Sequence, residues 1–87
     1  MTVYMAERNL AGIAMDDLAQ AQRSAIAEAE TMTAEGTEVR YIRTTFLPDE
    51  GKCMCLFEAE SAEVVERLNR AAELPFERIV EALDLTP

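Results

Sequence analysis

The amino-acid sequence predicts an α+β fold in which two helices cover one face of a four-stranded antiparallel sheet. Three observations predict it. Segments with strand and helix character follow one another in the order β-α-β-β-α-β. The two middle strands flank Pro48-Asp49-Glu50-Gly51, a run of turn-forming residues short enough for a hairpin. The strand after this turn, Cys53 to Ala59, is apolar on both of its faces.

The N-terminal third supplies a strand and a long helix. Thr2 to Arg8 is the strand, and Gly12 provides the turn that follows it. The segment from Met15 to about Glu35 is rich in Ala, Gln and Glu, contains no Gly or Pro, and gathers its apolar residues on one stripe. Gly36 is expected to end this helix.

The middle of the sequence forms the hairpin. Thr37 to Leu47 is rich in β-branched and aromatic residues that alternate along the chain, which is typical of a strand. Lys52 to Glu60 is the second arm. Because the turn between them is so short, the two arms must pair antiparallel.

The C-terminal third adds a helix from Ser61, which can cap it, to about Glu73. Pro75 prevents further helix. Phe76 to Leu83 is predicted as a final strand, although its Glu and Ala content also suits a short helix. Two βαβ halves joined by a hairpin make a ferredoxin-like sandwich with both helices on one face. Residues 1–87 are predicted to form this single domain.

Composition restricts the partners. The formal charge is −9, with 17 acidic and 8 basic residues, which argues against nucleic acid and anionic membrane as partners. The N-terminal residues lack the basic and apolar regions of a secretory signal, and no apolar stretch is long enough to span a membrane. Two cysteines do not make a disulfide framework. We therefore expect a cytoplasmic protein.

Alternation assigns side chains to the two faces of the sheet. Because Glu58 is expected to point away from the helices, Cys53, Cys55, Phe57 and Ala59 should lie in the core. The residues expected to join that core from the other strands are Val3, Met5, Ile42 and Phe46. The open face is then expected to hold Tyr4, Ala6, Tyr41, Met54 and Leu56, with Arg8, Arg43 and Glu58 around them. A single one-residue bulge would reverse such assignments.

The strand from Cys53 to Ala59 also predicts a partner. A strand that is apolar on both faces needs cover on both sides, and two helices can cover only one. An apolar centre with a charged rim is typical of a protein interface. The sequence therefore predicts that the open sheet face packs against a partner.

Four segments resemble a family of small bacterial domains of unknown function that includes a nickel-binding protein. They are Tyr4-Met5-Ala6-Glu7-Arg8, Val39-Arg40-Tyr41-Ile42-Arg43-Thr44-Thr45-Phe46, Cys53-Met54-Cys55-Leu56-Phe57-Glu58-Ala59 and Pro75-Phe76-Glu77-Arg78. The resemblance covers nearly the whole chain in the same order and spacing. It implies a ferredoxin-like fold, a dimer packed through its sheets and, for at least one member, nickel bound at the surface.

The chain departs from that family at three points. It contains no histidine, although nickel favours imidazole nitrogen, so no nickel ligands are carried over. Ala14 occupies the first-helix cap where related chains often have Thr, and Glu73 stands where they often have Gly. The first change should weaken the cap, and the second should disturb the end of the second helix.

Two groups of residues are candidates for chemistry. The Cys53 and Cys55 thiols are interpreted as core residues, with a soft-metal pair and a nucleophilic cysteine as the alternatives. A cluster on the open face is the candidate for a ligand-binding cleft at the dimer interface. Its members are Tyr4, Arg8, Tyr41, Arg43, Glu58 and Glu81. Interface ion pairs and hydrogen bonds are the simpler interpretation of the same cluster.

The sequence leaves three functions open, and it favours a non-enzymatic role. The first is a small dimeric metal-binding or accessory protein, with nickel implied only by the resemblance. The second is a small-molecule binder or small enzyme with a cleft at the dimer interface, and the third is a purely structural interaction module. Surface carboxylates can also bind divalent cations weakly. These are Asp16, Asp17, Asp49, Glu50, Glu77 and Glu81.

Overall fold

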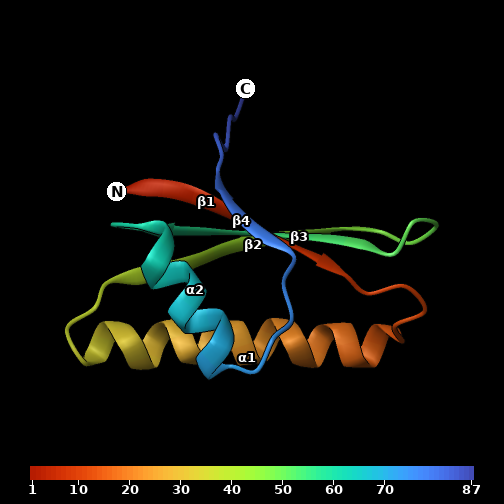
Figure 1. Cartoon of the computed structure of the whole chain (residues 1–87), viewed down its shortest axis with the longest axis horizontal. Coiled ribbons are helices and arrows are strands. Elements are labelled where there is room, and N and C mark those ends of the chain that lie inside the picture. Colours follow the sequence, from red (N-terminus) through yellow and green to blue (C-terminus); the bar gives the residue numbers. More distant parts are fainter.

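The computed structural model describes residues 1–87 and has the predicted β-α-β-β-α-β order (Figure 1). Its four strands form one antiparallel sheet in the spatial order β2-β3-β1-β4. The C-terminal segment is a strand, as predicted. The elements are β1 Thr2–Asn9, α1 Met15–Ala34, β2 Val39–Leu47, β3 Lys52–Ala59, α2 Ala62–Ala71 and β4 Arg78–Glu81.

Both helices lie on the same face of the sheet, which leaves the opposite face uncovered (Figure 1). The core lies between the sheet and the helices, and β3 supplies four of its buried residues, Cys53, Cys55, Phe57 and Ala59. Val65 and Leu68 of α2 pack into the same core. The predicted helix side of β3 is therefore confirmed, and Met54, Leu56 and Glu58 face the other way.

The facing of β1 is the reverse of the predicted one. In the β1–β3 register Tyr4 pairs with Phe57, Ala6 with Cys55 and Arg8 with Cys53. Cross-strand partners share a face, so Tyr4, Ala6 and Arg8 lie under the helices. The prediction failed because it kept the arginine out of the core, whereas Arg8 is 2% exposed.

It follows that Val3 and Met5, predicted as core residues, lie on the uncovered face. They are only partly exposed there, and Met5 pairs with Leu56 of β3 and Val80 of β4. We call this uncovered surface the open face. Its members on the four strands are Val3, Met5, Glu7, Asn9, Arg40, Arg43, Thr45, Leu47, Lys52, Met54, Leu56, Glu58, Arg78 and Val80.

A bulge in β2 corrects two more predictions. The β2–β3 register shifts between Tyr41 and Arg43, so Ile42 is an extra residue in the strand. Tyr41 therefore pairs with Phe57 on the helix side, and the two rings meet edge to face with centroids 5.7 Å apart. Ile42 does not join the core, whereas Phe46 packs against it as predicted. Arg43 lies on the open face, also as predicted.

Two helix ends have locally unfavourable features, as the sequence predicts. Ala14 is the N-cap of α1 and makes no side-chain capping bond, whereas Ser61 accepts the backbone N–H of Val64 at the start of α2. After α2, Glu73 has a left-handed backbone with φ of 56°, a conformation that costs free energy in any residue with a Cβ.

Neither helix is both long enough and apolar enough to cross a membrane.

Candidate functional site

Two cysteines and a buried arginine meet on the helix side of the sheet. Cys53 and Cys55 are neighbours along β3, and their sulfurs are 3.9 Å apart. Arg8 is the cross-strand partner of Cys53. Its Nη1 donates to the Pro75 carbonyl at 2.9 Å, whereas its Nη2 is buried and has no hydrogen-bond partner. Charge and polarity thus meet at this point of the core, whose other buried polar side chain is Asn69 of α2.

A small void of about 10 Å³ lies among these groups. The two cysteines and Arg8 line it from the sheet, and α1 closes it from above with Leu18 and Ala21. A void of this size holds about one water molecule. The site can therefore accept a single small species, and it excludes an organic substrate.

The pKa values of the two thiols are shifted in opposite directions. The hydrogen bond from Cys53 lowers the pKa of Cys55 to about 6, with help from the Arg8 charge and the Thr44 hydroxyl, although burial opposes the shift. Thr44 Oγ1 is 3.1 Å from Cys55 Sγ. The same hydrogen bond and burial raise the pKa of Cys53 well above its ordinary value. The pair therefore loses its first proton more readily than an isolated thiol does, and the Arg8 charge favours that loss.

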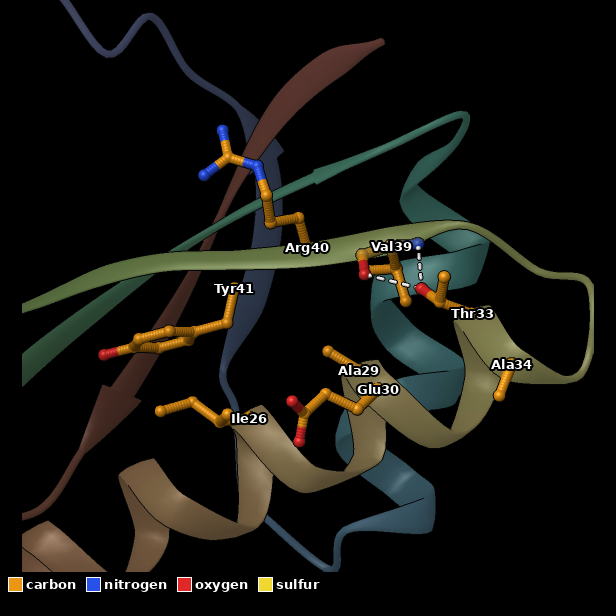
Figure 2. A pocket seen from close by; sticks show the side chains of 8 residues that line it. All are labelled: Ile26, Ala29, Glu30, Thr33, Ala34, Val39, Arg40 and Tyr41. Atoms are coloured by element: carbon orange, nitrogen blue, oxygen red, sulfur yellow. Dashed lines mark hydrogen bonds between the residues drawn. The ribbon is translucent and has the colours of Figure 1, made fainter.

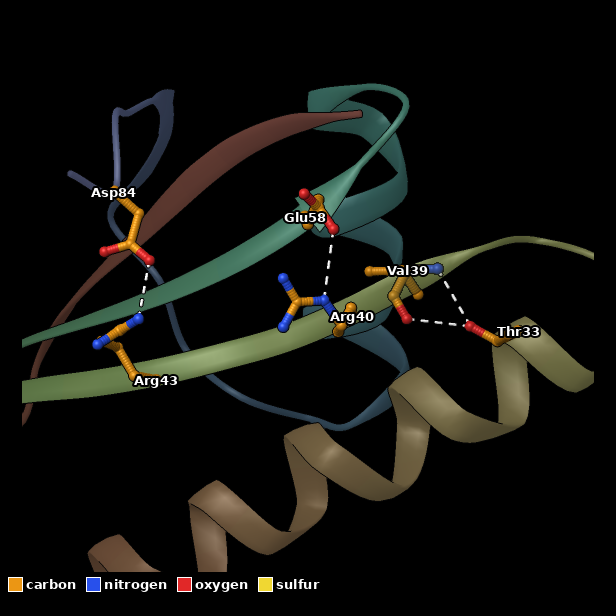
Figure 3. A network of polar contacts seen from close by, with 6 residues as sticks. All are labelled: Thr33, Val39, Arg40, Arg43, Glu58 and Asp84. Atoms are coloured by element: carbon orange, nitrogen blue, oxygen red, sulfur yellow. Dashed lines mark hydrogen bonds and ion pairs between the residues drawn. The ribbon is translucent and has the colours of Figure 1, made fainter. Parts of the chain in front are cut away.

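A second polar arrangement lies on the open face. Arg40 Nε is 3.3 Å from Glu58 Oε1, and Arg43 Nη2 is 2.9 Å from Asp84 Oδ2. Figure 3 shows both pairs on the side of the sheet opposite α1. Asp84 belongs to the segment after β4, so this ion pair holds that segment beside the open face. Two further ion pairs join Glu7 to Arg78 and Lys52 to Glu77.

The six residues predicted to line a cleft do not form one cluster. Arg43 and Glu58 lie on the open face, each in its own ion pair. Tyr4, Arg8 and Tyr41 lie on the helix side instead. Glu81 is the register partner of Tyr4 on β4 and is exposed. The sheet itself therefore separates the members of the predicted cleft.

A groove of about 540 Å³ runs between α1 and the outer edge of β2 (Figure 2). Tyr41 and Ile26 lie over one another in it, and Arg40 points away from it. The polar groups at the groove either bond within the chain or, like the Glu30 carboxylate, are exposed to solvent. Thr33 exchanges two hydrogen bonds with the backbone of Val39, and the Tyr41 hydroxyl accepts the Gln22 side-chain amide at 2.7 Å. No group in it requires a ligand.

The acidic residues do not assemble into a metal site within one chain. No group of three or more His, Cys, Asp or Glu side chains lies close enough to hold a metal ion. A structural zinc site normally has four such ligands, and a catalytic one has three. A tight site of this kind would need ligands from a second copy.

Sequence reasoning missed the role of Arg8 because it treated burial of an arginine as improbable. The available signal was the spacing in β1, where Tyr4, Ala6 and Arg8 alternate as regularly as Val3 and Met5 do. Pairing the small Ala6 with Cys55 across the two neighbouring strands would have pointed to the correct face of the sheet. The buried thiols were predicted correctly, but the charge beside them was not.

The order, the antiparallel sheet and the single helical layer define a small α+β protein of ferredoxin-like fold. Residues 4–82 match the family described as nickel responsive protein SCO4226-like, and the chain belongs to this family. The crystal structure of SCO4226 from Streptomyces coelicolor A3(2) is similar, with a TM-score of 0.79 and 28% sequence identity over 98% of this chain and 99% of that one. Comparison with curated proteins gives no match.

Proposed function

We propose that this protein is a small homodimeric accessory protein that responds to a divalent transition-metal ion, with the open face as its dimer interface. The observation that carries the proposal is the open face itself. Val3, Met5, Met54, Leu56 and Val80 form its apolar centre, and all five are partly exposed. A monomer of 87 residues buries only about 60–65% of its unfolded surface, so burying this centre would add substantially to stability.

The balance of charges on the open face supports a second copy of this chain as the partner. The chain as a whole carries a formal charge of −9, which makes two copies repel. Four of the five ion pairs use open-face residues, and they contain four cations and four carboxylates. The interface region is therefore neutral where the remaining surface is acidic. Arginines and carboxylates on one face also suit a two-fold interface, in which each patch meets its own copy.

The metal part of the proposal follows from the family and from the ligand count. The family is described as nickel responsive. Nickel favours imidazole, and this chain has no histidine, so oxygen ligands would have to serve at the surface. Because no three candidate ligands lie together in one chain, a dimer that combines carboxylates of both copies is the arrangement that could bind a metal tightly.

Calorimetric titration with Ni²⁺, Zn²⁺ and Mn²⁺ tests this proposal. We expect Ni²⁺ binding by the wild-type dimer and its loss in Leu56→Glu, which places a charge at the centre of the open face. Ile26→Glu introduces the same charge on α1 and should retain binding. Absence of heat at millimolar metal would reject the metal role, and equal binding by the Leu56→Glu monomer would reject the shared site.

A further inference from the structure

The buried thiol pair and Arg8 form an internal site that is separate from the proposed dimer interface. Arg8 is 98% buried, lines the void together with Cys53 and Cys55, and leaves Nη2 without a partner. An unpaired buried donor costs free energy, and more so when it is charged. An arginine in this position therefore points to negative charge on the sulfurs beside it.

The sulfur geometry suits an ion that bridges the thiols. A zinc–sulfur bond is about 2.3 Å long, so an ion with bonds of similar length can contact two sulfurs separated by 3.9 Å. A direct bond between the two sulfurs is disfavoured. Residues two apart on a strand have Cα atoms about 6.7 Å apart, at the upper limit of the range that disulfides span.

The net charge of the metal complex determines which ion suits the site beside Arg8. Two thiolates that bind one monovalent metal ion M⁺ form the complex RS–M–SR⁻, whose charge of −1 balances the +1 of the buried Arg8. When both thiols begin protonated, 2 RSH plus M⁺ becomes RS–M–SR⁻ plus 2 H⁺. A divalent ion would cancel that charge and leave the buried guanidinium without a counter-ion, which is costly.

We propose that Cys53 and Cys55 form a dithiolate site for one soft monovalent metal ion, Cu(I) being the physiological candidate, with Arg8 as the counter-ion of the complex. Thiolate ligands select Cu(I), zinc and iron–sulfur clusters, and of these Cu(I) is the monovalent ion. The void of about 10 Å³ has room for one ion and no larger ligand.

Access to this site runs under the N-terminal half of α1. Leu18, Ala21 and Gln22 of that half line the void. The helix begins at Ala14 without a side-chain cap, so its first turns open at a lower free-energy cost than those of a capped helix. Local opening of this kind admits a small ion without global unfolding.

The test is an anaerobic titration of the reduced protein with Cu(I) in competition with bicinchoninate. We expect one Cu(I) per chain, with release of the protons that the two thiols hold. Cys53→Ser and Cys55→Ser should each weaken binding by more than the roughly 10–100-fold that loss of an outer-shell partner causes. Met54→Leu removes the sulfur between them, on the opposite face, and should bind Cu(I) as the wild type does.

Arg8 is tested by selectivity. Arg8→Met should weaken Cu(I) binding by about 10–100-fold and shift the preference toward Zn²⁺, while Arg8→Lys should keep the preference for Cu(I). A purely structural arginine would change the stability and leave this preference unaltered. If Arg8→Met does not fold, the wild type still decides, because its competition between Cu(I) and Zn²⁺ needs no variant.

Three results would overturn the proposal. They are failure of the wild type to compete with bicinchoninate, Cu(I) binding retained by the Cys53→Ser/Cys55→Ser double variant, and stronger binding of Zn²⁺ than of Cu(I). The monomer-forming Leu56→Glu variant should keep its Cu(I) site, because all of its ligands lie in one chain. Failure of the dimer and failure of this site are therefore distinguishable.

Discussion

Arg8 and Cys53 are cross-strand partners on the covered face of the sheet, and this pairing puts a positive charge beside two buried thiols. No carboxylate pairs with Arg8. The ionisable groups beside it are instead the thiols of Cys53 and Cys55, and the Arg8 charge helps to lower the pKa of Cys55. The core of this small protein therefore has a titratable centre, and its stability should depend on that titration.

The first prediction concerns this pH dependence. The pKa of Cys55 falls from 9.0 to about 6 in the folded protein, so its thiolate contributes no stability below pH 6. Between pH 6 and pH 9 the unfolded chain binds the additional proton, and the free energy of unfolding should rise by at most about 1.4 kcal/mol per pH unit. Above pH 9 the raised pKa of Cys53 reverses the trend, because there the folded state keeps a proton that the unfolded chain releases.

Urea unfolding of the wild type and Cys55→Ser across that pH range measures the effect. The wild type should gain stability relative to the variant as pH rises from 6 to 9. Met54→Leu, which leaves both thiols in place, should follow the wild type. If the free energy of unfolding varied with pH in the same way in the wild type and Cys55→Ser, Cys55 would not ionise in the core.

The second prediction concerns the start of α1. Ala14 already has the extended backbone of an N-cap, with φ of −73° and ψ of 147°, but it lacks a capping side chain. Ala14→Ser should raise the free energy of unfolding by about 0.5–2 kcal/mol. Ala27→Ser, at an exposed position within α1, should instead lower it by a few tenths of a kcal/mol. Thermal unfolding compares the two, and a loss of stability in both variants would contradict the prediction.

The third prediction concerns Glu73, whose φ of 56° suits glycine. Glu73→Gly should stabilise the protein by about 1 kcal/mol, because it removes the left-handed strain of a residue with a Cβ. Glu63→Gly, within the helical part of α2, should destabilise it by a similar amount. Chemical denaturation with both variants measures the two changes, and a destabilised Glu73→Gly would show that its side chain is needed there.

The fold could be predicted from the sequence because the residues that begin and end its elements act locally. The turn from Pro48 to Gly51, the glycine after the first helix and the proline after the second each act on their immediate neighbours. The final strand was the weakest of these predictions, and its pairing with β1 confirms it.

The face of the sheet on which each side chain lies could not be predicted locally, because it depends on how the strands pair. Val3 and Tyr4 are both suitable core residues, and only the register with β3 shows that Tyr4 lies opposite Phe57. Local pattern also cannot place a bulge, and the extra residue Ile42 turned Tyr41 toward the helices. The predicted cleft residues were divided between the two faces for these two reasons. Arg8 was misplaced because no carboxylate pairs with it, so no charge pattern in the sequence indicates its burial.

The final prediction concerns the open face. Leu56 lies near its centre, paired with Met5 on β1 and Arg43 on β2. Leu56→Glu should separate the dimer into folded monomers, because it would bury two unpaired carboxylates across a two-fold interface. Ile26→Glu, with the same change of charge on the helical side, should leave the dimer intact.

Sedimentation equilibrium of the wild-type protein tests the central proposal most directly. At micromolar concentration we expect a mass twice that of the 9.7 kDa chain, falling to the monomer mass in Leu56→Glu with an unchanged circular dichroism spectrum. A wild-type protein that sediments as a stable monomer at that concentration would contradict the proposed interface and the metal site shared across it.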